Sequence, residues 1–161
     1  MNIKTSLIVC LSFLAQSLMA STIVKEADIC IYGATSAGIT AAYAAQREGK
    51  SVVLIEPSNR IGGLSAGGLG QTDIGRASVI QGLAMEFYTR VGKKYGKDTP
   101  VFQFEPKVAL AVYEDMLRDA GLKVEMPYRL RSVKKKGSMI ESIVLENSKK
   151  PSSSRIKVKA R

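Results

Sequence analysis

The chain of 161 residues carries 24 basic and 14 acidic side chains, giving a formal net charge of +10, and it contains no His. The lack of His excludes the most common general base, the most common metal ligand and every nucleophile that a histidine activates. Hydrophobic residues make up 45% of the chain, enough for a packed core, so global disorder is also excluded.

Residues 1–20 have the pattern of a secretory signal peptide. Lys4 gives a positive start, residues 7–14 form an apolar run, and small residues follow at Ala15, Ser17 and Ala20. We expect cleavage after Ala20, with a cut after Ser17 as the alternative. The apolar run is shorter than the roughly 20 residues of a membrane span, so we expect export without stable membrane insertion. A buried N-terminal helix is the competing interpretation.

Two cysteines are present, Cys10 and Cys30. Cys10 would be removed with the signal peptide, which leaves Cys30 alone inside an apolar run. An intramolecular disulfide and a cysteine-based metal cluster are therefore excluded for the mature chain, and we expect no metal site. Cys30 is predicted to be a buried structural thiol.

A strand, a helix and a second strand are predicted between positions 27 and 56. Residues 27–32 form an apolar run rich in β-branched side chains, and residues 51–56 form another, as expected for parallel strands buried on both faces. Between them, residues 36–48 are rich in alanine and end at Gly49, a typical helix stop. This order predicts a βαβ unit.

The remainder of the chain predicts helices followed by short strands. A glycine-rich stretch at 57–75 is too long for a simple connection. Helices are expected over 79–95 and from Pro106 to Gly121, and a third short strand over 122–126. A β-meander is predicted after these elements, with strands at about 128–134, 139–146 and 155–161.

The positive charge is concentrated in this meander. Residues 1–120 hold 12 basic and 11 acidic residues, whereas residues 121–161 hold 12 and 3. One interpretation is a patch that binds polyanions. We favour a solvated face of antiparallel strands, because the lysines at 134–136 lead into Gly137 like a hairpin loop. Aromatic residues do not alternate with the basic ones, so we expect no nucleic-acid partner.

The turn between the first strand and the first helix, Gly33-Ala34-Thr35-Ser36-Ala37-Gly38, is close to the dinucleotide fingerprint G-x-G-x-x-G. Thr35 stands where the middle glycine would let the backbone approach a pyrophosphate, so its side chain must point away or bond to a phosphate. The helix start at Ser36 offers free N–H groups to that anion. Glu56 ends the second strand, and its distance along the chain from Gly33 is typical of an acidic residue that binds ribose hydroxyls.

Shortly after Glu56 comes Arg60-Ile61-Gly62-Gly63, and here the resemblance becomes specific. Residues 28–73 resemble the opening of FAD-dependent oxidoreductases of the glutathione-reductase-like superfamily, and most of all the bacterial family with secreted, xanthan lyase-like members. A G-x-T-x-A-G turn is familiar in that family. The resemblance implies FAD as cofactor, bound by Gly33, Thr35, Ser36, Ala37, Gly38, Glu56, Arg60, Gly62 and Gly63.

The resemblance also implies a fold and a reaction. We expect an α/β protein in which residues 27–161 form a three-layer Rossmann-like FAD/NAD(P)-binding domain with a parallel sheet and a β-meander insert. The implied activity is flavin-dependent oxidation or reduction of a small or carbohydrate-derived substrate. The alternatives are an NAD(P)-dependent dehydrogenase and a non-catalytic dinucleotide-binding fragment.

The resemblance extends over about residues 27–148. Relatives continue into another parallel strand, a Gly-Asp pair at the flavin and a substrate domain, so we expect a C-terminally truncated chain that is inactive alone. Asp73, Arg76 and Tyr88 are candidates to face substrate, but no residue is assigned as catalytic.

Overall fold

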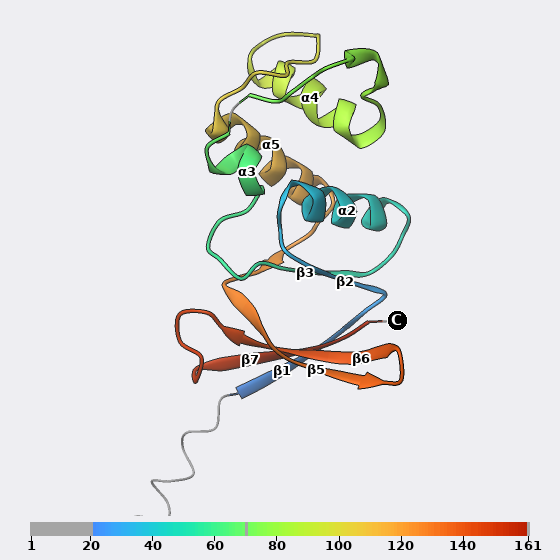
Figure 1. Ribbon diagram of the computed structural model, residues 1–161, viewed down its shortest axis with the longest axis vertical. Coiled ribbons are helices and arrows are strands. Elements are labelled where there is room, and N and C mark those ends of the chain that lie inside the picture. The colour runs from blue at the N-terminus through green and yellow to red at the C-terminus, as the bar shows by residue number, and fades with distance from the viewer. Residues whose placement is uncertain (1–20, 70, 161) are drawn as a thin grey trace, which may run out of the picture.

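The computed structural model describes residues 21–69 and 71–160, which form three layers. In Figure 1 a helical layer covers one face of a small parallel sheet, and a second, larger sheet covers the other. The signal peptide predicted for residues 1–20 lies outside the described residues. In chain order the elements are β1 (Ser21–Ala27), β2 (Ile29–Tyr32), α2 (Ser36–Arg47), β3 (Val52–Ile55), α3 (Gly63–Gly67), η2 (Ala77–Val79), α4 (Gly82–Lys94), α5 (Pro106–Asp119), β4 (Val124–Glu125), β5 (Tyr128–Lys136), β6 (Met139–Asn147) and β7 (Ser154–Ala160).

The small sheet has the order β2-β3-β4, and all three strands are parallel. Helix α2 connects β2 to β3, so the predicted βαβ unit is confirmed, and with it the α/β class. The apolar runs of β2 and β3 follow from this position between two layers. In β3, Leu54 packs in the helix-side core, whereas Val53 and Ile55 pack in the core between the two sheets. Because successive side chains of a strand point to opposite faces, a strand covered on both faces is apolar throughout.

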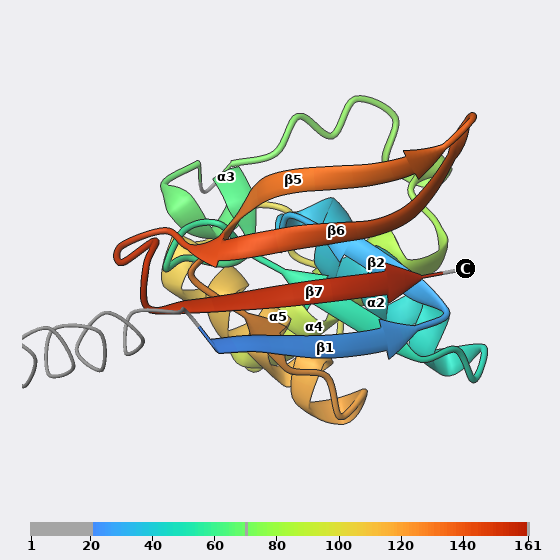
Figure 2. The same cartoon turned by 90° about the horizontal axis from the view of Figure 1, so that it is seen from below.

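The larger sheet has the order β1-β7-β6-β5 (Figure 2). Its strands β5, β6 and β7 are antiparallel neighbours, which confirms the predicted meander, and Gly137 turns the first hairpin with a φ of +60°. Strand β1 was not predicted. It pairs in parallel with β7 over its whole length, from Ser21 opposite Ser154 to Ala27 opposite Ala160.

The first predicted strand is therefore divided between two sheets. β1 ends at Ala27 and β2 begins at Ile29, so the chain changes sheet at Asp28. Asp28 is held there by Ser51: its N–H donates to Ser51 Oγ at 2.8 Å, and its Oδ2 accepts from the Ser51 N–H at 3.0 Å. This paired turn replaces the continuous strand expected over 27–32.

One further element and two boundaries differ from the prediction. The glycine-rich stretch contains the short helix α3 (Gly63–Gly67). The helix expected from Val79 begins at Gly82, after a separate 3₁₀ turn at Ala77–Val79. The strand expected over 122–126 is reduced to Val124–Glu125. Glycine and serine are poor helix formers, so α3 depends on tertiary contacts that local sequence does not report.

Carboxylates balance part of the positive charge of the larger sheet. Arg129 and Arg131 of β5 lie 2.8 and 2.5 Å from the carboxylate oxygens of Glu146 on β6. In the same hairpin, Lys134 lies 2.7 Å from Glu141. The basic run thus lies on antiparallel strands, as we favoured, and several of its charges are paired across them.

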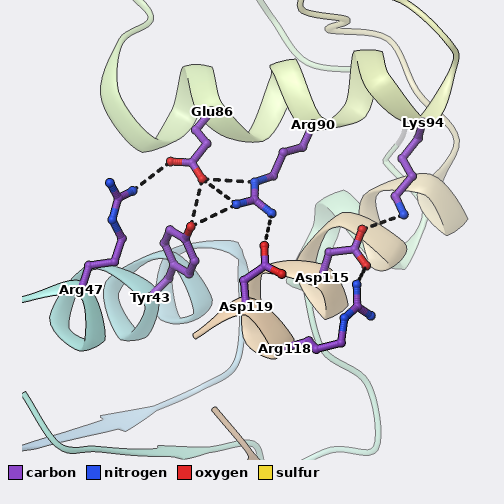
Figure 3. Close-up of polar contacts among 8 residues, drawn as sticks. All are labelled: Tyr43, Arg47, Glu86, Arg90, Lys94, Asp115, Arg118 and Asp119. Atoms are coloured by element: carbon purple, nitrogen blue, oxygen red, sulfur yellow. Dashed lines mark hydrogen bonds and ion pairs between the residues drawn. The ribbon is translucent and has the colours of Figure 1, made fainter. Parts of the chain in front are cut away.

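A polar cluster connects α4 to the other two long helices (Figure 3). Glu86 Oε2 accepts from Arg47 of α2 at 3.0 Å, and its Oε1 accepts from the Tyr43 hydroxyl at 3.1 Å. Arg90 donates to Glu86 Oε1 at 2.9 Å and to Asp119 of α5 at 2.6 Å. The guanidinium groups of Arg47 and Arg90 also lie 5.5 and 5.7 Å from the centre of the Tyr43 ring.

Charge balance within this cluster decides the ionisation of Glu86. Burial raises its pKa, but hydrogen bonds from Arg90 and Tyr43 and the positive charges of Arg90 and Arg47 outweigh burial and lower the pKa below the ordinary 4.5. The ionised carboxylate is therefore the form that stabilises the helical layer.

Replacing Glu86 by Gln should lower the free energy of unfolding near pH 7 by about 1 kcal/mol, because the charge-assisted bonds to Arg90 and Arg47 are lost. Because folding lowers the pKa of Glu86, its contribution is complete above the unfolded value and disappears as the pH falls through the folded one. The difference between wild type and variant should therefore shrink in acid. Denaturant unfolding near pH 7 and near pH 3 measures it. Glu114→Gln, on the exposed face of α5, is the control, and an equal cost for both variants would contradict the prediction.

Candidate dinucleotide site

The turn between β2 and α2 requires glycine at its first position because of its backbone conformation, and at its last because of close packing. Gly33 has a φ of +106°, a conformation that L-residues with a Cβ rarely adopt, and its N–H donates to Ile55 O at 2.7 Å. A Cβ on Gly38 would lie 1.8 Å from Gly33 O. The two glycines let the first turn of α2 pack directly on the end of β2.

Thr35 is the N-cap of α2. Its Oγ1 accepts from the Gly38 N–H at 3.2 Å, and its carbonyl oxygen accepts from the Ile39 N–H at 2.9 Å. The side chain is thus directed back to its own helix, the first of the two arrangements that the sequence left open. A threonine in the middle position of the turn therefore does not block the approach of an anion to the backbone.

Two backbone donors remain at the start of α2. The N–H groups of Ser36 and Ala37 belong to the first helical turn, where no intrahelical acceptor exists. In the described part of the chain they have no acceptor, whereas the N–H of Ala34 is already bonded to Glu56. Adjacent donors at the positive end of a twelve-residue helix can bind an anion such as a diphosphate.

Glu56 lies at the end of β3 and is only 7% exposed. Its Oε2 accepts from the Ala34 N–H at 2.8 Å, and its Oε1 accepts from the Ser58 N–H at 2.9 Å. Each carboxylate oxygen accepts one backbone bond and keeps further acceptor capacity. The sequence indicated a ligand-facing carboxylate; the structure adds that the same group fixes the glycine turn.

The segment from Arg60 to Gly63 lies against that turn. The Gly62 N–H donates to Ala34 O at 2.7 Å. A Cβ on Gly63 would lie 3.3 Å from Thr35 Cβ, so the two backbones are in close contact. The side chain of Arg60 is exposed, at the rim of this group. All of the predicted positions except Arg60 therefore gather at one place, and Arg60 marks its edge.

The three candidates for substrate contact are not part of this group. Asp73 and Arg76 are exposed in the connection between α3 and η2. Tyr88 packs among aromatic rings, with its centroid 4.6 Å from that of Phe102 and 5.4 Å from that of Phe87. Its contacts are those of a core residue.

The sequence did not predict three further residues that contact the site. Ala34 bonds to both Glu56 and Gly62 through its backbone, which no side-chain pattern reports. Ser58 follows closely on Glu56, at a spacing where a short polar loop can fold back on its carboxylate. Tyr113 arrives from α5 and contacts Gly62, a long-range approach with no local signal.

Two other kinds of feature are absent from the described residues. No group of three or more His, Cys, Asp or Glu side chains there is arranged to hold a metal ion. Among residues 21–69 and 71–160, no helix has the length and apolar character needed to cross a membrane.

Comparison with known proteins agrees with this geometry. The model of a family described as "FAD dependent oxidoreductase" matches residues 28–160. Similar solved structures include THI4 of Thermovibrio ammonificans (15% identity over 98% of this chain and 61% of that one, TM-score 0.56), L-proline dehydrogenase from P. horikoshii (19%, 87% and 22%, 0.52) and the bacillithiol disulfide reductase Bdr (YpdA) from Bacillus cereus (17%, 83% and 38%, 0.54). Identities this low establish the fold alone. No curated protein sequence matches. The chain spans less than two thirds of each of these three structures.

Gly38→Ala should destabilise the protein by about 3 kcal/mol, because its methyl group would overlap Gly33 O and push α2 away from β2. Gly67→Ala is the matched control. Gly67 is also helical, and a Cβ there meets nothing within 4 Å, so this change should be neutral or slightly stabilising. Denaturant unfolding of both variants tests the close approach, and equal stability of the two would refute it.

Proposed function

The chain belongs to the FAD dependent oxidoreductase family, whose cofactor is FAD, and on that premise we propose that the Gly33–Gly38 turn, Glu56 and the Arg60–Gly63 segment bind the adenosine diphosphate part of FAD. The fit of the turn to a diphosphate rests on its backbone. Two N–H donors at Ser36 and Ala37 are available, and the capping role of Thr35 keeps its side chain directed to the helix. An anion can therefore approach the main chain.

Glu56 is the proposed ribose ligand. It comes from the strand next to β2, and its bonds to Ala34 and Ser58 hold the carboxylate beside the turn. The remaining acceptor capacity of its two oxygens suits a pair of ribose hydroxyls. A ribose bound here would be adjacent to a diphosphate bound at the start of α2.

One observation carries the proposal: the bond from the Gly62 N–H to Ala34 O at 2.7 Å. It brings the Arg60–Gly63 segment to the glycine turn, so that two distant stretches of chain line one dinucleotide site. A nicotinamide-binding βαβ unit needs only the turn and the acidic residue. The second segment supports flavin over nicotinamide dinucleotide.

The bound flavin would supply the redox chemistry, and the described residues would supply binding and orientation. We propose that the protein is an oxidoreductase and that its substrate is a small or carbohydrate-derived molecule. The substrate class rests on the resemblance of residues 28–73 to secreted, xanthan lyase-like members of the family.

The test of cofactor choice is direct. The purified protein is denatured in acid, and the released cofactor is identified by chromatography and by its absorption spectrum. We expect FAD. Recovery of NAD alone would overturn the proposal in favour of a dehydrogenase, and the absence of any nucleotide even after incubation with excess FAD would favour a non-catalytic fragment.

Glu56 variants localise the site in the same assay. Glu56→Ala should weaken FAD binding by about 10- to 100-fold, since bonds to a charged group contribute roughly 1.5–3 kcal/mol. Glu56→Gln keeps an acceptor for one backbone N–H and separates loss of charge from loss of the turn. Glu48→Ala is the control, because Glu48 is exposed at the other end of α2. Equal affinities in the Glu56 and Glu48 variants, by fluorescence titration, would remove Glu56 from the site.

We further propose that the protein is exported to the periplasm or beyond, on the pattern of residues 1–20. Mature protein should begin near Ser21. Its single thiol, Cys30, is partly buried, so it should react slowly with a labelling reagent until the protein is denatured. N-terminal sequencing of protein from each cell fraction is the measurement, and an intact Met1 in a cytoplasmic pool would contradict export.

A further inference from the structure

Ser148 connects the β-meander to the segment that carries Glu56. It lies directly after β6, and its Oγ donates to Pro57 O at 2.6 Å. Its N–H donates to Pro127 O at 2.9 Å, just before β5. Ser148 and Pro57 are 91 positions apart in the sequence, so their contact exists only in the folded chain. Ser148 thus holds the residue that follows the proposed ribose ligand.

The peptide group between Pro57 and Ser58 extends this contact to Glu56. Its carbonyl oxygen accepts from Ser148, and its N–H donates to Glu56 Oε1 at 2.9 Å. The peptide is trans, so its C=O and N–H point in opposite directions. Fixing the carbonyl end therefore directs the N–H at the carboxylate. A bond accepted by the carbonyl oxygen also polarises the peptide group and makes its N–H a stronger donor.

The neighbouring main-chain bonds leave the orientation of this peptide open. The Glu56 N–H donates to Glu125 O at 3.0 Å, and the Tyr128 N–H donates to Glu56 O at 2.9 Å. Both bonds hold the end of β3, but neither reaches beyond Glu56. The proline ring restricts φ of residue 57 and not ψ, the angle that turns the next peptide. Because Ser58 is exposed, water can compete with Glu56 for its N–H unless the peptide is held.

We propose that Ser148 is a positioning residue for the adenosine ribose of FAD, fixing the Pro57–Ser58 peptide so that its N–H holds the Glu56 carboxylate in place for the ribose hydroxyls. The inference rests on the proposed function of Glu56. It gives the connection between β6 and β7 a part in cofactor binding. Ser148 acts on the ribose only through this peptide and Glu56.

The first test is the FAD affinity of the whole chain, measured by fluorescence titration. Ser148→Ala should weaken binding about fivefold, the value of one hydrogen bond. Ser148→Thr keeps a hydroxyl on the same carbon and should bind FAD as wild type does. Ser153→Ala is the matched control: Ser153 Oγ donates to Lys150 O at 2.7 Å within the same connection, so its loss should leave FAD affinity unchanged.

A double-mutant cycle separates positioning from general destabilisation. In the Glu56→Ala background, Ser148→Ala should cause no further loss of FAD affinity, because no carboxylate is left to be positioned. Additive losses in the double variant would overturn the inference. Wild-type affinity in Ser148→Ala, or a loss in Ser148→Thr as large as that in Ser148→Ala, would overturn it as well.

Amide hydrogen exchange gives a second readout that needs no ligand. In Ser148→Ala the Ser58 N–H should exchange about fivefold faster than in wild type, because its bond to Glu56 is weakened. The Tyr128 N–H, which is bonded to Glu56 O, reports general loosening of the chain and should exchange as in wild type. Equal acceleration at both positions would show that Ser148 is merely structural.

The outcomes also separate this inference from the function on which it rests. If wild type binds no FAD, the proposed function fails, and the role of Ser148 with it. If wild type binds FAD and Ser148→Ala does not differ, only the role of Ser148 fails. Should Ser148→Ala not fold, Ser148→Cys places a weaker donor on the same carbon and should bind FAD less tightly than Ser148→Thr; equal affinities of these two would overturn the inference.

Discussion

The approach of α2 to β2 is the constraint on which the site depends. With no Cβ at Gly38, the first turn of the helix rests on the carbonyl group of Gly33. That contact aims the start of α2 at the end of the parallel sheet and fixes the place where Glu56 and Gly62 can reach the turn. Both of them do so through Ala34, a residue with a single methyl side chain. The site is thus assembled mainly from main-chain groups, and side chains serve to keep those groups in place.

Glu56 shows how one residue can serve both the fold and the ligand. A buried carboxylate without partners is costly, and here backbone N–H groups on either side satisfy it before any ligand arrives. The ribose would then meet a group that is already oriented, so little ordering is left for the binding step. The main chain of Glu56 contributes as well, because its N–H and C=O bond to Glu125 and Tyr128 and so connect the two sheets.

The parts of the fold that sequence predicts are those with local signals. The apolar runs at β2 and β3, the alanine-rich α2 and the alternation of the meander all have a periodicity that can be counted. The candidate positions likewise follow from a contiguous turn, an acidic residue and a short glycine segment. Strand β1 gives no such signal, because its sequence includes Lys25 and Glu26 and its partner, β7, lies at the other end of the described chain. Tyr113 is missed for the same reason, because its contact with Gly62 exists only after the chain has folded. Ser58 differs, since its bond to Glu56 is local.

The pairing of β1 with β7 has a consequence for the order of folding. β1 is the first of the described strands in the chain and its partner β7 is the last, so the edge of β1 stays unpaired until all the elements between them are available. Closing so long a loop slows the final step of folding, and an unpaired strand can meet other chains in the meantime. While β1 is unpaired, its exposed Ile23 and Val24 favour aggregation, whereas the charged Lys25 and Glu26 beside them oppose it. The register of β1 in the larger sheet is thus decided only when β7 has been made.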